Sequence, residues 1–331
     1  MPSHLHRIAT LALCTAMLGT AFSAAAQAMQ AAADWPQKPV RLVVPYAPGG
    51  TADTLGRLIA NHLSGAYRQP FIVDNRGGAG GAIGSQAVAK SPADGYTLLV
   101  SGIGSHVIAP VDSPKAFNPV ADFSHIALLG GPPTVLVAGP ALPVKDLGGL
   151  IAFVAASPSG LSWASPGQGT HGHLIGELFA ASARLNMVHI GYKGAAPAVS
   201  DVLAGQVPAA FVTLSSANAH MQAGKLRALA ITAEKRLADY PDVPTFAELG
   251  YPKLTALTWF GISGPAGMPR ALVDKINLEV RHGLSTPAAR QQLALEGIMT
   301  FDWDAPTFNR FFKSEIERWT PLVRSVDKTK S

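Results

Sequence analysis

Apolar and polar positions follow two rhythms along the chain, one typical of strands and one typical of helices. A β-rich apolar run at residues 40–46 ends at Pro48, Gly49 and Gly50, and apolar residues then recur at helical spacing over 55–63. The same order of strand, glycine-rich loop and helix recurs at 71–90, and a further strand is predicted at 96–100. This alternation predicts an α/β fold with doubly wound, mainly parallel sheets.

A second set of elements begins after the loop of two glycines and two prolines at 130–133. The predicted strands are 134–138, 161–164, 188–192, 207–213, 226–232 and 257–263; the predicted helices are 144–156, two that end near 184 and 204, 217–223, 270–285, 287–296 and 306–323. No long linker separates the two sets, so we expect two lobes that share the chain. Residues 29–131 would begin lobe 1, 132–253 would form lobe 2, and 254–331 would return to lobe 1 as C-terminal helices, with crossings near Gly131 and Lys253.

The first 28 residues have the pattern of a secretory signal peptide. A short basic segment with His4, His6 and Arg7 precedes an apolar run, which ends in the small residues Ala26-Gln27-Ala28. We expect cleavage after Ala28; the alternatives are a membrane anchor and a lipoprotein box at Cys14. Since Cys14 is the one cysteine of the chain, cleavage would remove every thiol and with it disulfides and cysteine-bound metal.

Composition narrows the classes of partner. The mature chain of about 300 residues is long enough for about two domains. Charged residues make up 14% of the sequence, and the net charge of +5 is scattered without a basic block. Nucleic acid is therefore not an expected partner, because its binding needs clustered cations. No stretch after the signal peptide is long and apolar enough to span a bilayer.

The glycine-rich turns between strands and helices carry the most informative chemistry. The first backbone N–H groups of a helix have no intrahelical acceptor, and the helix dipole places partial positive charge there. Such ends bind anions without Arg or Lys. The best examples are Tyr46-Ala47-Pro48-Gly49-Gly50-Thr51 and Tyr192-Lys193-Gly194-Ala195. If these turns meet where the two sheets face each other, they form a site for a small anion.

Enzymatic signatures are weak in this sequence. The glycines at 76–84 lack the dinucleotide spacing, and neither a phosphate-binding lysine loop, G-x-S-x-G nor H-E-x-x-H occurs. His171 and His173, with Glu177 one turn later, are a conceivable metal cluster, but no second group of His or Cys supplies the remaining ligands. We therefore expect Thr170 to cap a helix there, and we expect no metal, no cofactor and no catalysis. A metal-dependent enzyme or hydrolase using His171 and His173 stays the alternative.

Several ordered motifs resemble one known family, the Bug-type solute receptors of tripartite tricarboxylate transporters. The resemblance covers nearly the whole mature chain and rests on residues 35–53, 73–81, 92–99, 167–174, 192–194, 224–230 and 241–245. It implies a type II-like, two-lobed periplasmic binding fold, a location in the periplasm and a small organic carboxylate as ligand. It also implies delivery of that ligand to integral membrane subunits; we expect the receptor itself to be a monomer.

The resemblance also implies the site residues. One ligand carboxylate would be held by the first glycine turn, with Asp53 in the same motif; the opposing lobe would contribute Ser165, Thr170, Tyr192, Lys193, Gly194 and Ala195, with Asp201 as a weaker candidate. Ser101 and Ser105 are expected in a variable loop that sets specificity. One departure is Pro208, where the family usually has aspartate. Because proline lacks an N–H, we expect the first rungs of that strand to be altered.

Overall fold

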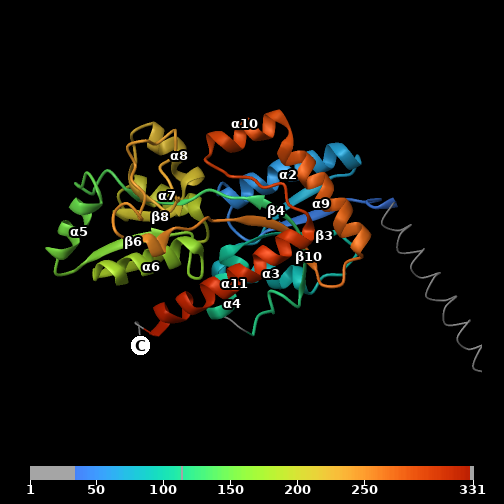
Figure 1. Ribbon diagram of the computed structural model, residues 1–331, viewed down its shortest axis with the longest axis horizontal. Helices are drawn as coiled ribbons and strands as arrows, with labels where there is room; N and C mark the ends of the chain where they lie inside the picture. Colours follow the sequence, from blue (N-terminus) through green and yellow to red (C-terminus); the bar gives the residue numbers. More distant parts are fainter. Residues whose placement is uncertain (1–33, 113–114, 329–331) are drawn as a thin grey trace, which may run out of the picture.

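The structure contains two five-stranded sheets side by side (Figure 1). It is a computed structural model that describes residues 34–112 and 115–328, so the expected signal peptide, its cleavage site and Cys14 lie outside the described residues. The first sheet has the order β2-β1-β3-β10-β4. Its strands are β1 (Val40–Val44), β2 (Phe71–Asn75), β3 (Thr97–Gly102), β4 (Phe123–Gly130) and β10 (Phe260–Pro265). We call the part built on this sheet lobe 1.

The second sheet forms lobe 2 and has the order β7-β6-β8-β5-β9. Its strands are β5 (Thr134–Ala138), β6 (Leu161–Ser165), β7 (Met187–Gly191), β8 (Ala209–Thr213) and β9 (Arg227–Ile231). The two-lobed α/β fold expected from the sequence is thus confirmed. The chain passes from lobe 1 to lobe 2 between β4 and β5 and returns between β9 and β10.

Both sheets are mixed, and less parallel than the alternation of elements predicted. In lobe 1, β10 runs antiparallel to β3 and β4, while β1 pairs in parallel with β2 and β3. In lobe 2, β5 is antiparallel to β8 and β9 in the same way. Strands β5 and β10 are the first strands after a crossing. They enter their sheet on the side where most of the other strands have their carboxyl ends. They therefore run in the opposite direction.

Helices cover both faces of each sheet (Figure 1). Lobe 1 carries α2 (Thr51–Tyr67), the short η1 (Ala79–Gly81), α3 (Ala82–Ala89), the π-helical turn η2 (Gly104–Ile108), α4 (Ala109–Asp112), α9 (Arg270–Ser285), α10 (Pro287–Leu295) and α11 (Ala305–Lys328). Lobe 2 carries α5 (Leu147–Ala155), α6 (His171–Ala183), α7 (Ala195–Leu203) and α8 (Leu214–Gln222), and η3 (Pro252–Leu254) precedes the return to lobe 1. No helix among residues 34–112 and 115–328 is long and apolar enough to cross a membrane.

Helix α2 illustrates how the apolar pattern fixes the orientation of a helix. Leu55, Ile59 and Leu63 recur every four residues and are fully buried against the sheet of lobe 1. Burying side chains of this size contributes about 1.5–3 kcal/mol each. This packing fixes the axis of α2, so its first residue, Thr51, is held at the edge of the sheet that faces lobe 2.

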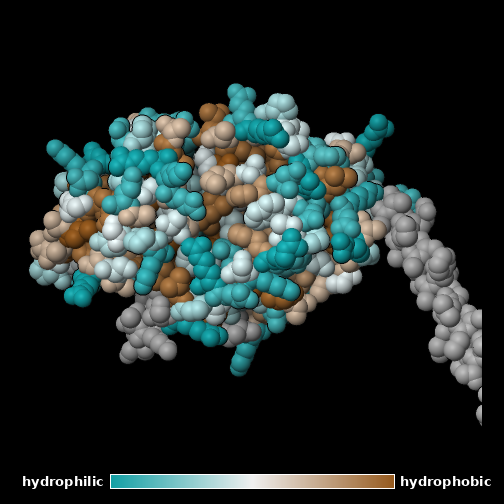
Figure 2. Space-filling view, in the orientation of Figure 1, coloured by the Kyte–Doolittle hydropathy of each residue, from teal (hydrophilic) through white to brown (hydrophobic). Residues whose placement is uncertain are grey.

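A continuous core joins the two lobes behind their interface. The indole N–H groups of Trp259 and Trp319 both donate to Glu315 Oε2, at 2.9 and 3.0 Å. Trp259 lies just before β10, and the other two residues lie on α11, which also packs against α6 of lobe 2. Figure 2 shows hydrophilic side chains spread over both lobes, with hydrophobic ones visible between them near the middle of this face.

Several element boundaries differ from the sequence-based expectations. Strand β4 was not predicted, because its apolar run precedes a loop of glycines and prolines and has no alternating polar positions. Strand β10 begins at Phe260, whereas the sequence predicts a strand from residue 257. The residues before Phe260 belong to the segment that crosses between the lobes. Strand β8 begins at Ala209, directly after Pro208, whose carbonyl accepts a hydrogen bond from the N–H of Gly139 at 2.8 Å.

Candidate functional site between the lobes

A small cavity of about 50 Å³ lies between the two sheets. This is room for a few water-sized groups, because one such group needs about 10–15 Å³ on this measure. Both lobes and the segment that crosses back to lobe 1 contribute to its walls. The lining residues are Tyr46, Gly50, Thr51, Ala52, Gly104, Thr134, Pro166, Thr170, His171, Gly172, Ala195, Thr213, Thr258 and Phe260.

Four helices begin at this cavity. Its wall includes the first residues or the preceding cap of α2, α6, α7 and α8, represented by Thr51, His171, Ala195 and Thr213. Each helix start presents N–H groups without an intrahelical acceptor, together with the positive end of the helix dipole. Within the part of the chain that the structure describes, no Lys or Arg lines the cavity. Its positive potential therefore comes from backbone, which suits an anion.

The turn before α2 is held in place by Asp53. The N–H of Gly49 donates to Asp53 Oδ2 at 3.0 Å, Arg57 Nε donates to the same oxygen at 2.9 Å, and Asn75 Nδ2 donates to Oδ1 at 3.0 Å. Burial opposes ionisation of this carboxyl, but the hydrogen bonds from Arg57, Gly49 and Asn75 outweigh it and lower the pKa of Asp53. Asp53 does not line the cavity, so it positions the turn while other atoms face the cavity.

Three backbone N–H groups beside this turn are available to a ligand. In the described part of the chain, no protein group accepts the N–H of Gly50, Thr51 or Ala52, and all three residues line the cavity. Gly49 has φ of +86°, which favours glycine, whereas Gly50 has an ordinary extended conformation with φ of −94°. The sequence placed Gly49 and Gly50 together in the anion site; in the structure Gly49 shapes the turn and Gly50 faces the cavity.

The rest of the first turn supports this arrangement. Pro48 is exposed and lies outside the cavity wall, while Tyr46 lines it. The hydroxyl of Tyr46 donates to the carbonyl of Gly80 at 3.3 Å. Burial raises the pKa of Tyr46 to about 12, so the phenol stays protonated at neutral pH. Tyr46 can thus offer a ligand a polar but uncharged surface.

The lobes touch each other at this end of the cavity. The N–H of Ala47 in lobe 1 donates to the carbonyl of Lys193 in lobe 2 at 2.9 Å. The hydroxyl of Thr51 lies 2.6 Å from that of Thr213 and 2.5 Å from that of Ser215. These hydrogen bonds, one between backbone groups and two between side chains, join the two lobes in a closed arrangement.

The turn before α7 brings Ala195 to the cavity but directs the polar side chains elsewhere. Lys193 is exposed and contributes its carbonyl to the contact between lobes. Gly194 has φ of +156°, and a Cβ there would lie 3.1 Å from the Cβ of Ala47, so the closed arrangement favours glycine. The hydroxyl of Tyr192 donates to Asp201 Oδ2 at 2.6 Å. Burial and this contact raise the pKa of Tyr192 to about 12.

The loop before α6 is shaped by two buried hydroxyl groups. Ser165 Oγ accepts the N–H of Gly167 at 3.1 Å and does not line the cavity. Thr170 lines the cavity, donates to the carbonyl of Gly167 at 2.7 Å and accepts the N–H of His173 at 3.3 Å. The prediction that Thr170 caps this helix is confirmed.

The loop expected to contain Ser101 and Ser105 begins later than the sequence predicted. Ser101 lies inside β3, where its buried hydroxyl accepts a hydrogen bond from Ser263 Oγ at 2.8 Å. The strand extends beyond its predicted end because β10, from a distant part of the sequence, pairs with it. Ser105 lies in η2, and its hydroxyl contacts His106 Nδ1 at 3.0 Å. Neither serine lines the cavity, although Gly104 beside Ser105 does.

The deep wall of the cavity contains residues that the sequence did not mark as ligand-binding, although it did mark His171 as part of the alternative metal site. Thr134 and Thr258 lie in or beside the crossing segments, and their hydroxyls are 2.9 Å apart. His171 Nδ1 lies 2.7 Å from Thr258 Oγ1. Burial lowers the pKa of His171 to about 3, so the ring is neutral at neutral pH. Phe260, at the start of β10, lines the same cavity. The sequence showed the helix start at His171 and the polar side chains of the two threonines. It did not show that these residues lie together.

His171 and His173 do not form one cluster. Positions two apart on a helix point to different sides. His171 contacts Thr258 and the ring of Trp319, whereas His173 packs beside His189 and lies 3.5 Å from a carboxylate oxygen of Glu177. The alternative enzyme that used the two histidines together therefore has no geometric basis. His189 is a neighbour that the sequence analysis missed, because it comes from β7.

Comparison with known proteins gives a consistent result. A family model described as the tripartite tricarboxylate transporter family receptor matches residues 55–327. Protein BugT from Bordetella pertussis is 36% identical over 316 residues, which cover 94% of this chain and 96% of that protein.

Two solved structures from Rhodopseudomonas palustris share the fold. One, with adipate, is 33% identical with a TM-score of 0.84 and covers 88% of this chain and 98% of that one. The other, MatC with bound malate, is 31% identical with a TM-score of 0.83 and covers 87% of this chain and 100% of that one. With the match to the family model, these similarities establish that the chain belongs to the receptor family of the tripartite tricarboxylate transporters.

Proposed function

We propose that this receptor binds a small organic carboxylate in the cavity between its lobes and delivers it, chemically unchanged, to the membrane subunits of a tripartite transporter. The observation that carries the proposal is the convergence of four helix starts on a cavity whose wall has no cationic side chain among the described residues. An exported protein with a cleaved signal peptide would perform this task outside the cytoplasm, as a monomer.

A carboxylate matches the available donors. Its two oxygens accept several hydrogen bonds at once, and bonds from N–H groups to a charged acceptor are shorter and stronger than neutral ones. Gly50, Thr51 and Ala52 supply such N–H groups from lobe 1, and the start of α7 at Ala195 faces them from lobe 2. We assign one ligand carboxylate to the space between these two helix starts.

The rest of the ligand would extend toward the deep wall. Thr134, Thr258 and the neutral ring of His171 offer hydroxyl and imidazole groups there, and Phe260 offers an apolar surface. Two relatives support a ligand with a second polar end, because adipate and malate, which are both dicarboxylates, are bound in their structures. The neutral deep wall would discriminate among such acids through hydrogen bonds and shape.

Closure couples binding to delivery. A ligand that contacts both lobes binds the closed state more tightly than the open one and so shifts the population toward closure. The contacts of Ala47 with Lys193 and of Thr51 with Thr213 add to the closed state. The membrane subunits would then recognise the surface that closure creates.

A thermal-shift screen tests the proposal. Purified mature protein is heated with a panel of mono-, di- and tricarboxylates, aromatic acids and acidic amino acids. A matching acid at 100 times its Kd stabilises the folded state by about 2.7 kcal/mol and raises the melting temperature. The uncharged amide of each active acid is the control and should give no shift. If no acid of the panel shifts the melting temperature, the proposed ligand class is wrong.

A further inference from the structure

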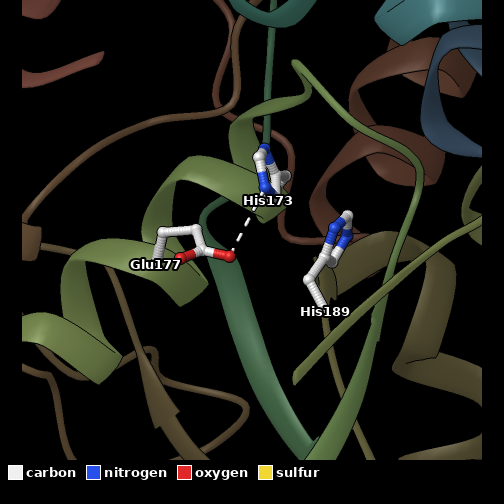
Figure 3. A group of neighbouring side chains, drawn as sticks. All are labelled: His173, Glu177 and His189. Atoms are coloured by element: carbon white, nitrogen blue, oxygen red, sulfur yellow. Dashed lines mark ion pairs between the residues drawn. The ribbon is translucent and has the colours of Figure 1, made fainter. Parts of the chain in front are cut away.

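A second polar cluster lies in lobe 2, apart from the cavity wall. It consists of His173 and Glu177, one turn apart on α6, and His189 on the neighbouring strand β7 (Figure 3). One possible ligand atom from each residue lies within 4.8 Å of the others. His173 Nε2 is 3.5 Å from Glu177 Oε1, and the two imidazole ring centres are 4.2 Å apart.

The surroundings of His173 leave one of its nitrogens without a hydrogen-bond partner. Nε2 of His173 is buried and makes no hydrogen bond within the described residues, and the side chain is 6% exposed. Trp163 packs against both histidine rings, with ring centres 6.3 Å from His173 and 4.7 Å from His189. The polar neighbour of Nε2 in this cluster is Glu177 Oε1 at 3.5 Å, which is too far for a good hydrogen bond, and a cation bound between the two atoms would give Nε2 a direct partner.

We propose that His173, Glu177 and His189 bind one Zn²⁺ ion. Two imidazoles and one carboxylate are a donor set that zinc prefers, with the fourth tetrahedral position left for water. The distance of 3.5 Å between the His173 and Glu177 ligand atoms is close to the edge of a tetrahedron with zinc–ligand bonds of about 2.0–2.1 Å. The third ligand, His189, lies on the edge strand of the sheet and is half-buried, which gives the ion a path from solvent.

One neighbouring group is suited to orient a ligand, and another neighbouring contact would have to be given up when zinc binds. Ser165 Oγ lies 2.6 Å from His189 Nε2, a contact of the kind that fixes the ring of a metal-binding histidine. The N–H of Gly169 lies 3.3 Å from His173 Nδ1. If zinc binds Nε2, the ring proton lies on Nδ1, which can then no longer accept a hydrogen bond. The long contact with the N–H of Gly169 would therefore be lost when the metal bond forms. Gly169 belongs to the loop that brings Pro166 and Thr170 to the cavity, so zinc binding would act on the wall of the carboxylate site.

Metal titration tests the assignment directly. Mature protein without an affinity tag is treated with chelator, and Zn²⁺ binding is followed by calorimetry, by metal content after gel filtration and by the melting temperature. We expect one ion per chain and a higher melting temperature with zinc. H189Q should weaken zinc binding more than about 100-fold, because removal of an outer-sphere partner alone costs about 10–100-fold. E177Q should also weaken it.

A matched control separates this site from adventitious binding. His62 Nε2 lies 2.6 Å from Glu279 Oε1 in lobe 1, so H62Q removes another histidine paired with a carboxylate. H62Q should bind zinc as the parent does. The melting temperatures of the variants without zinc report whether each is folded. Absence of stoichiometric zinc in the parent, or equal zinc affinity in folded H189Q and the parent, overturns the proposal. Because zinc is measured without any carboxylate, these results are independent of the proposed transport function.

Discussion

The two glycine turns that face each other across the cavity achieve the same exposure of helix N–H groups by different means. In lobe 1, the side chain of Asp53 reaches back to Gly49 and is held by Arg57 and Asn75. In lobe 2, the turn before α7 has no side-chain cap, and Tyr192 and Asp201 brace its flanks through one hydrogen bond. The first turn is held by a charged network, the second mainly by packing against lobe 1.

This difference predicts unequal responses to mutation and pH. The first turn should keep its shape in the open and closed states, because the hydrogen bonds of Asp53 that hold it lie within lobe 1. The second turn gains contacts with Ala47 only when the lobes meet. Lobe 1 would thus provide a preformed anion site, and lobe 2 would complete it on closure.

The largest effect is expected for G50V. A Cβ at Gly50 would lie 3.7 Å from the Cβ of Ala195, inside the space between the two helix starts, and φ of −94° allows a side chain without strain. Loss of two N–H contacts to a carboxylate costs about 3 kcal/mol or more, so affinity should fall more than about 100-fold. Calorimetry with an active acid measures the loss.

G65V is the control for that variant. Gly65 is an exposed residue of the same helix, and a Cβ there meets no atom within 4 Å. Both variants should melt near the parent temperature, and G65V should retain its affinity. Near-normal affinity in folded G50V would show that the first turn is not the anion site.

An intermediate effect is expected for D53N. Removing the charge from a buried acceptor of three hydrogen bonds should destabilise the protein by about 1–3 kcal/mol and weaken ligand binding through the displaced turn. The folded-state pKa of Asp53 is lowered, so its stabilising contribution is complete above the unfolded value, about 3.9, and is lost as pH falls through the lower folded value.

Melting temperatures of the parent and D53N across acidic pH check this linkage. The difference between them should be largest at neutral pH and shrink as the solution is acidified below about pH 4. A pH-independent difference would show that the carboxylate charge does not hold the turn.

The smallest effect is expected for Y192F. The variant removes one hydrogen bond to Asp201, which is worth about 1 kcal/mol, and leaves the packing of the ring intact. Ligand affinity should fall by less than about tenfold. Denaturant unfolding and calorimetry on the same sample measure both quantities. A loss as large as that of G50V would contradict the view that Tyr192 supports the turn without supplying a main ligand contact.

The amino-acid sequence by itself determined the local structure, the glycine turns and the motifs of the family. Apolar periodicity predicted most helices and strands, because burial of one face requires it. Glycines at 49 and 194 marked strand-to-helix turns, because their backbone conformations exclude most side chains. The ordered motifs pointed to the receptor family, which the match to residues 55–327 confirms.

Only the tertiary structure decided which of these pieces meet. Thr134, His171 and Thr258 form one wall because the chain crosses between lobes twice, and sequence spacing carries no signal of that crossing. Ser101 lies in a strand and not in the expected loop because β10 extends β3 by pairing with it. His189 comes close to His173 because β7 packs beside β6. The polarity of a helix start comes from the backbone, so it is the same for every sequence. Contacts between distant segments depend on how the lobes pack, so they arise with the fold and not from any local pattern.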